Sequence, residues 1–176
     1  MDPQTPSQSP VEPEPQAPVE DLRTQIASHI LAGKNVLVTV KANPSVDELA
    51  SALGLTFLLG ALDKHATAVF SGKIPSAVEF LDPEKVFEGS VDSLRDFIIA
   101  LDKEKADKLR YKVEDDVVKV FITPYRTVIS EKDLSFSQGD YNVDMVIALG
   151  VSQKEQLDKA ILAHGKILHD ATVVTL

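Results

Sequence analysis

Short apolar runs rich in β-branched residues alternate with helical patterns along this chain, and this alternation is the strongest constraint on its fold. Residues 22–32 repeat apolar side chains at helical spacing, and the run Asn35–Val40 (NVLVTV) follows them. Such alternation favours a mostly parallel sheet flanked by helices. We therefore expect an α/β fold. Its sheet should contain Asn35–Val40, Ala66–Phe70, Val143–Leu149 and Ala171–Leu176.

A second helix is expected to begin directly after Pro44. Ser45 and Glu48 have the spacing of a capping box, in which each side chain accepts a hydrogen bond from the other residue's backbone. Leu49, Leu53 and Phe57 then recur on one face of this helix. We expect that face to lie against the sheet.

The middle of the chain is less regular. Residues 109–113 and 118–122 alternate apolar and polar side chains around an acidic turn, which predicts an inserted antiparallel β-hairpin with one solvated face. Residues 127–130 would extend this hairpin. The run Phe97–Leu101 (FIIAL) is typical of a buried strand, and residues 74–81 are a candidate helix before Asp82-Pro83.

The C-terminal part returns to the α/β pattern. We expect a helix over Gln153–His164 with Leu157, Ile161 and Leu162 directed inward. The final run reaches Leu176 without a closing helix, which favours a domain that is incomplete at its C-terminus.

The N-terminal residues differ in composition from the rest. Residues 1–18 hold six of the chain's ten prolines and no bulky apolar cluster, so we expect a disordered acidic tail ahead of one domain over residues 19–176. The chain has no cysteine and no apolar run long enough for a membrane span, and it lacks a signal-peptide pattern. These features favour a cytoplasmic protein. The formal net charge of −9 disfavours a stable complex with nucleic acid.

The loop that follows the first strand is the natural place for a ligand. Ligands of open α/β sheets bind beyond the carboxyl ends of the strands. This loop also enters a helix N-terminus, where free amides and the helix dipole favour an anion. Lys41 adds a positive charge nearby, whereas the carboxylate of Asp47 competes for the same amides. We expect weak binding of a small anion or nucleotide here.

The same loop resembles the first motif of the DHH-family phosphoesterases, His-x-x-Pro-Asp-x-Asp-x-x-Gly-Ser. Pro44, Asp47 and Ser51 match this motif without gaps. Lys41 stands at the histidine position, Ser45 at the first aspartate position and Ala50 at the glycine position. A second match is the segment YNVDMVIALGV, where Asp144 begins an apolar strand and Gly150 stands where the family has a metal-binding aspartate.

The resemblance implies a domain that has lost its metal centre. Family members hold two divalent cations, usually manganese, with histidine and aspartate ligands, and such a pair activates water for hydrolysis. A lysine ammonium has no acceptor, and glycine has no side-chain ligand. The eponymous Asp-His-His triplet and the later substrate domain do not occur before Leu176. The sequence therefore predicts no catalytic residue, no metal ligand and no cofactor.

Three functions remain open from the sequence. The first is a degenerate, non-catalytic domain that retains a nucleotide or phosphate at a weak site, with ligand-binding residues Lys41, Asn43, Ser45, Asp47, Ser51 and Gly150. The second is an active manganese-dependent phosphoesterase that acts on short oligonucleotides, cyclic dinucleotides or nucleoside phosphates. The third is an interaction domain that reaches a protein partner through the sheet edge or the N-terminal tail.

Overall fold

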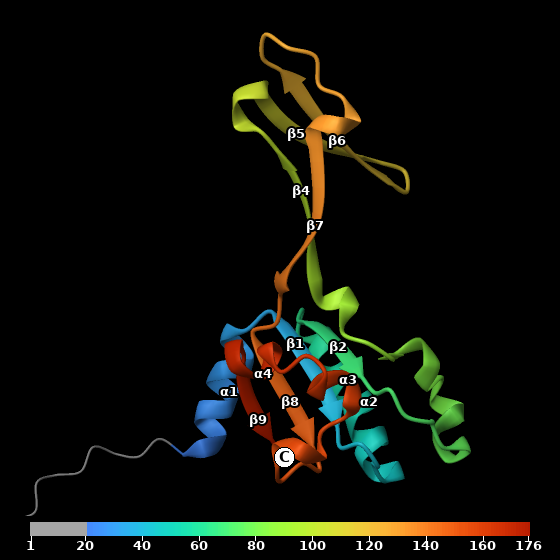
Figure 1. Ribbon diagram of the computed structural model, residues 1–176. Coiled ribbons are helices and arrows are strands. Elements are labelled where there is room, and N and C mark those ends of the chain that lie inside the picture. The colour runs from blue at the N-terminus through green and yellow to red at the C-terminus, as the bar shows by residue number, and fades with distance from the viewer. Residues whose placement is uncertain (1–20) are drawn as a thin grey trace, which may run out of the picture.

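The computed structural model describes residues 21–176, so the predicted disorder of residues 1–18 lies outside the described part. Its centre is a five-stranded sheet with the order β3-β2-β1-β8-β9, and all its strands are parallel (Figure 1). The four runs that were expected to share a sheet do so, which confirms the α/β fold. The strands are β1 (Asn35–Val40), β2 (His65–Val69), β3 (Phe87–Glu88), β8 (Met145–Leu149) and β9 (Thr172–Thr175).

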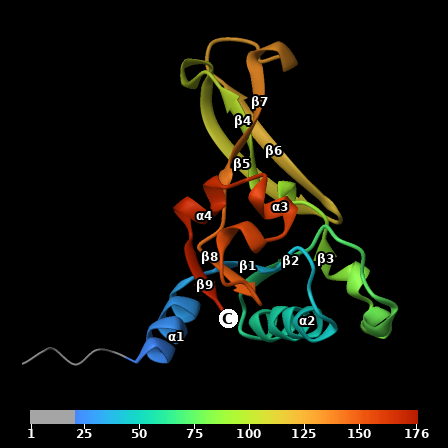
Figure 2. The same ribbon diagram turned by 60° about the horizontal axis from the view of Figure 1, so that its bottom comes forward.

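Helices cover both faces of this sheet (Figure 2). One face carries α1 (Leu22–Ala32) and α2 (Val46–Ala61), and the other carries α3 (Lys159–Leu162) and α4 (Lys166–Asp170). Successive side chains of a strand point to opposite faces. Thus Val36 and Val38 pack with Leu53 of α2, whereas Leu37 packs with Ile161 and Ile167. Among the described residues, no helix is long and apolar enough to cross a bilayer.

Short 3-10 helices make up much of the remaining connections. The segment predicted as a helix over 74–81 contains the first of them. They are η1 (Ser76–Leu81), η2 (Pro83–Lys85), η3 (Asp92–Leu94), η4 (Lys103–Lys105), η5 (Glu131–Asp133) and η6 (Lys154–Gln156).

An antiparallel arm projects from the body between β3 and β8 (Figure 1). Its stem pairs β4 (Arg95–Leu101) with β7 (Leu134–Tyr141), and its outer part pairs β5 (Ala106–Glu114) with β6 (Val117–Pro124). The predicted hairpin over 109–123 is therefore confirmed, but it is one part of a longer insertion. We call residues 95–141 the arm and β5–β6 its ribbon.

Two predictions for this region are wrong. Phe97–Leu101 is not a buried strand, because β4 lies in the stem and Phe97 is 62% exposed. Residues 127–130 do not extend the hairpin, since the strand that follows begins only at Leu134. An apolar run does not distinguish a strand in the central sheet from one in a protruding ribbon.

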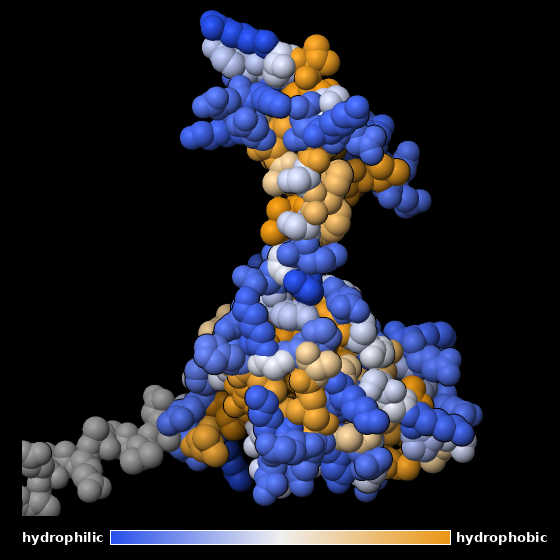
Figure 3. Space-filling model, viewed as in Figure 1, coloured by the Kyte–Doolittle hydropathy of each residue, from blue (hydrophilic) through white to orange (hydrophobic). Residues whose placement is uncertain are grey.

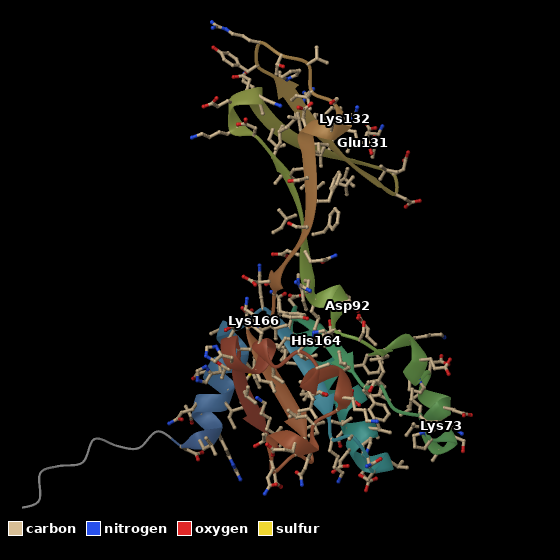
Figure 4. The ribbon with its side chains drawn as sticks, in the orientation of Figure 1. Lys73, Asp92, Glu131, Lys132, His164 and Lys166 are labelled. Atoms are coloured by element: carbon tan, nitrogen blue, oxygen red, sulfur yellow. The ribbon has the colours of Figure 1, made fainter. Side chains whose placement is uncertain are left out.

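Contacts at the base of the arm join it to α4 and to the turn between α3 and α4. Tyr141 Oη lies 2.7 Å from His164 Nδ1, and the Arg95 guanidinium stacks over the Tyr141 ring. Lys166 forms an ion pair with Asp140, which lowers the pKa of this carboxyl group. Figure 4 shows His164 and Lys166 at this junction. The arm is thus tied to the body at its foot.

The helix predicted over Gln153–His164 is interrupted. It consists of η6, an extended residue at Leu157, and then α3. Leu157 and Ile161 are buried as expected, but Leu162 is 37% exposed. Likewise, Leu49 and Leu53 of α2 are buried whereas Phe57 is 59% exposed. This break in the helix allows residues 156–158 to run past the carboxyl end of β1.

Candidate ligand cleft

The carboxyl ends of β1, β2 and β8 meet at one edge of the sheet. From β1 the chain continues outward to β2 and β3, while β8 and β9 lie on the other side of β1. The strand order therefore reverses between β1 and β8, the position at which open α/β sheets form a ligand crevice. Here Gln156–Asp158 crosses the end of β1. Ala42 N donates to Gln156 O at 2.8 Å, and Asp158 N donates to Val40 O at 3.2 Å.

Glu48 connects the two sides of this crevice. As the sequence predicts, Ser45 caps α2: Glu48 N donates to Ser45 Oγ at 3.2 Å, and Ser45 N donates to Glu48 Oε2 at 2.7 Å. The other carboxylate oxygen, Oε1, lies 2.8 Å from Lys41 Nζ. The hydrogen bond from Lys41, together with that from the Ser45 backbone, holds the pKa of Glu48 below its ordinary value.

Gly150 leaves the space that Glu48 fills. The backbone of Gly150 has a φ of +68°, which an L side chain rarely adopts. A Cβ atom at this position would lie 1.9 Å from Glu48 Oε1. The structure thus gathers Lys41, Ser45 and Gly150 from the predicted set around one carboxylate. The sequence identified Glu48 only as a capping residue.

The other three predicted residues lie apart from this cluster. Asp47 and Ser51 are exposed on α2, and within residues 21–176 their side chains have no hydrogen-bond or ion-pair partner. Glu48, and not Asp47, accepts the hydrogen bond from the Ser45 amide and pairs with the Lys41 ammonium. Asn43 lines a neighbouring cleft with residues that the sequence analysis did not select. The ligand-binding roles of all six residues stay predictions.

A pair of divalent cations does not fit the residues at this edge. The Lys41 ammonium pairs with Glu48 and offers no lone pair to a metal, and Gly150 supplies no side-chain ligand. Over the described part of the chain, no three His, Asp or Glu side chains form a group that could hold a metal ion. The ammonium supplies the local positive charge that a cation would otherwise bring.

A cleft of about 500 Å³ lies beside this ion pair, between the loops that follow β1 and β2. Its polar lining comes from Asn43, Ser71, Lys73, Asp158 and Lys159. Lys73 and Lys159 are exposed, and neither has an ion-pair partner among the described residues. Figure 4 shows Lys73 in the segment after β2, on the side of the body away from the arm. Two free ammonium groups at one cleft favour an anion.

Asp158 forms the buried wall of this cleft and is 2% exposed. Its Oδ1 accepts from Ala160 N at 2.9 Å and so caps α3, while Oδ2 accepts from Ser71 Oγ at 3.1 Å. Through these bonds and its own amide, Asp158 joins the ends of β1 and β2 to α3. No sequence signal marked it, because it lies inside the segment predicted as one continuous helix.

The loop after β2 carried a partial signal in the triplet Ser71-Gly72-Lys73. It lacks the upstream glycines of a phosphate loop, so the sequence pattern does not predict a phosphate site there. Gly72 instead allows close packing: a Cβ there would lie 2.4 Å from the Phe70 ring. The loop therefore turns tightly over Phe70 and places Ser71 and Lys73 at the cleft.

Comparison of the chain with protein-family models, curated proteins and solved structures finds no match. The likeness to the DHH family therefore rests on the motifs in the sequence.

The Lys41–Glu48 pair predicts a specific dependence of stability on pH. The pKa of Glu48 is below its ordinary value of 4.5 in the folded chain, so its contribution is complete above that value. The contribution is lost as pH falls through the folded pKa. Urea unfolding of wild type and Glu48→Gln should therefore differ at pH 7, and the difference should shrink as pH falls below about 4.5. A difference that is constant or grows at acid pH would contradict this assignment.

Proposed function

We propose that this chain is a non-hydrolytic, DHH phosphoesterase-like domain that binds a nucleoside phosphate in the cleft between the loops after β1 and β2. The observation that carries the proposal is a pair of lysines, Lys73 and Lys159, at a cleft on the carboxyl edge of a parallel sheet, neither with an ion-pair partner within residues 21–176. Ligands of open α/β folds bind at this edge. The ligand class is the one that the sequence predicts, but the phosphate would bind at Lys73 and Lys159 and not at Lys41.

The size and polarity of the cleft favour a nucleoside phosphate over a bare anion. A volume of about 500 Å³ lies within the usual range for small-molecule sites. The two ammonium groups suit a phosphate. The Asn43 amide offers an acceptor to a ribose hydroxyl or a base amino group. Because the Asp158 carboxylate in the cleft wall repels phosphate, the affinity should be modest.

The absence of hydrolysis follows from the residues beside the cleft. Hydrolysis by the DHH family needs metal ions that activate water. The positions that match the family's ligands here include Lys41, which pairs with Glu48, and Gly150, which has no side chain to bind a metal. We infer that the ion pair keeps this part of the crevice closed. A nucleoside phosphate would then bind beside the ion pair and be released without hydrolysis.

Titration with adenosine and guanosine monophosphates tests the proposal. We expect amide shifts in NMR spectra centred on residues 71–73 and 158–159, with a dissociation constant on the order of 0.1–1 mM. The double variant Lys73→Ala/Lys159→Ala should weaken binding about tenfold or more, because each contact to phosphate is charge-assisted. Incubation of wild type with a dinucleotide and manganese should release no mononucleotide.

The matched control removes two positive charges far from the cleft. Lys103 and Lys132 lie on the arm, and neither forms an ion pair among the described residues (Figure 4 labels Lys132). Lys103→Ala/Lys132→Ala should leave the affinity unchanged. Equal weakening in both double variants would show only a net-charge effect. Amide shifts centred on Lys41 would show that the ligand binds at the loop after β1 and not in the cleft. Release of mononucleotide in the presence of manganese would favour an active phosphoesterase.

A further inference from the structure

The ribbon has one wholly apolar face. In an antiparallel pair, residues directly opposite each other lie on the same face of the sheet. The register pairs Leu109 with Ile122, Tyr111 with Val120, and Val113 with Val118. These six side chains form what we call the apolar ribbon face. The other face is charged, with Lys108, Arg110, Lys112 and Lys119. It also carries Glu114, which pairs with Lys112 and Lys119, and the residues Val117, Phe121 and Thr123.

In the described part of the chain, five of the six side chains of this face are exposed, and Ile122 is partly buried. Leu109 and Tyr111 are each 74% exposed, and Val113, Val118 and Val120 are more than half exposed. Strands β5 and β6 pair with each other and have no extensive contact with the body. Figure 3 shows hydrophobic residues at the surface of the arm, away from the body. A two-stranded ribbon is at best marginally stable in water, so this face needs cover.

The extent of the exposed surface suits a protein interface. Contiguous apolar patches on monomers rarely exceed roughly 300–600 Å². Five of the six side chains of the apolar ribbon face are exposed, and Ile99, Phe97 and Phe136 of the stem are each at least half exposed. A standard interface buries roughly 800 Å² on each partner. The exposed apolar side chains of the arm can supply the apolar centre of such an interface.

The distribution of charge identifies the occupant. An arm that inserted its apolar face into a membrane would direct Lys108, Lys112 and Lys119 away from the anionic headgroups. A second ribbon of the same kind has no such conflict, because both charged faces remain in solvent when two apolar faces meet. Two stacked ribbons also make a four-stranded sandwich, which exceeds the minimum of about three strands for a stable small sheet.

The geometry points to a homodimer in which the apolar ribbon faces of two copies pack against each other about a two-fold axis. Two-fold dimers are the commonest homo-oligomers, and their interface uses the same patch on both subunits. The axis would pass near the central pair, Tyr111 and Val120. This role of the arm is independent of ligand binding in the cleft.

Sedimentation of the full chain tests the dimer. We expect wild type to dimerise with a micromolar or lower dissociation constant. Tyr111→Glu places two carboxylates against each other at the axis and should weaken the dimer about 30-fold or more. Lys108→Glu changes the charge of the opposite face, where Lys108 pairs with Thr123, and should leave the dimer intact.

A second measurement does not depend on a destabilising substitution. The chain has no cysteine, so Val120→Cys provides a single thiol near the axis and Lys108→Cys provides one on the outer face. Stacked sheets lie about 10 Å apart, so a bis-maleimide of about that span should link two Val120→Cys chains. It should not link Lys108→Cys chains efficiently.

Several outcomes would overturn the dimer. One is a wild-type chain that remains monomeric at about 0.1 mM. Another is a dimer that Tyr111→Glu leaves unchanged, or equal cross-linking of the two cysteine variants. Binding of the monomer to anionic vesicles through the same face would assign the arm to a lipid surface.

Discussion

Gly150→Asp is expected to destabilise the chain by about 2–3 kcal/mol. The aspartate would have to adopt a φ of +68°, which costs an L residue about 1 kcal/mol or more. Its Cβ would also displace the Glu48 carboxylate, from which it would lie 1.9 Å. The Lys41 ion pair and the bond to the Ser45 amide would then weaken together. Urea unfolding measures the change.

Two further variants isolate the cause of that loss. Gly54→Asp introduces the same side chain at an exposed position of α2 with nothing within 4 Å, so it should be neutral or slightly stabilising. Glu48→Ala removes the collision, so Gly150→Asp should cost less in that background than in wild type. Equal costs in both backgrounds would show that Glu48 does not occupy the space. Greater stability of Gly150→Asp would contradict the close packing altogether.

Asp158→Ala is expected to lower the free energy of unfolding by about 2 kcal/mol. The variant loses the acceptor for Ala160 N at 2.9 Å and for Ser71 Oγ at 3.1 Å. A partly buried donor left without a partner costs about 1–3 kcal/mol. Removal of a buried carboxylate also removes the free-energy cost of desolvating it. The net loss of stability should therefore be smaller than the summed contributions of the two hydrogen bonds. Denaturant unfolding is again the measurement.

The neighbouring bonds supply graded controls for Asp158. Asp158→Asn keeps one amide oxygen as an acceptor and should lose less stability than Asp158→Ala. Ser71→Ala removes only the bond from an exposed hydroxyl, so its cost should stay below about 1 kcal/mol. In Asp158→Ala, the amide of Ala160 should exchange faster with solvent. Wild-type stability and protection in this variant would exclude Asp158 as the link between β1, β2 and α3.

The sequence alone determined the elements whose signal is local. Strand β1 has the predicted bounds, Asn35–Val40, because a short β-branched run between helices is typical of a central parallel strand. The Ser45–Glu48 capping box formed as expected, since both of its bonds depend on a spacing of three residues. The alternation of such elements also predicted the α/β class. Each of these inferences uses neighbouring residues only.

Tertiary structure decided how distant segments combine. The FIIAL run is apolar enough for a core, yet β4 pairs with β7 in the arm, a choice that depends on strand partners and not on composition. The helix expected over Gln153–His164 breaks at Leu157 because residues 156–158 hydrogen-bond to the end of β1. Glu48 meets Gly150, and Asp158 meets Ser71, only after the parallel sheet aligns the strand ends. Periodicity reports which side of an element is buried, whereas the partner on that side is set by long-range pairing and register.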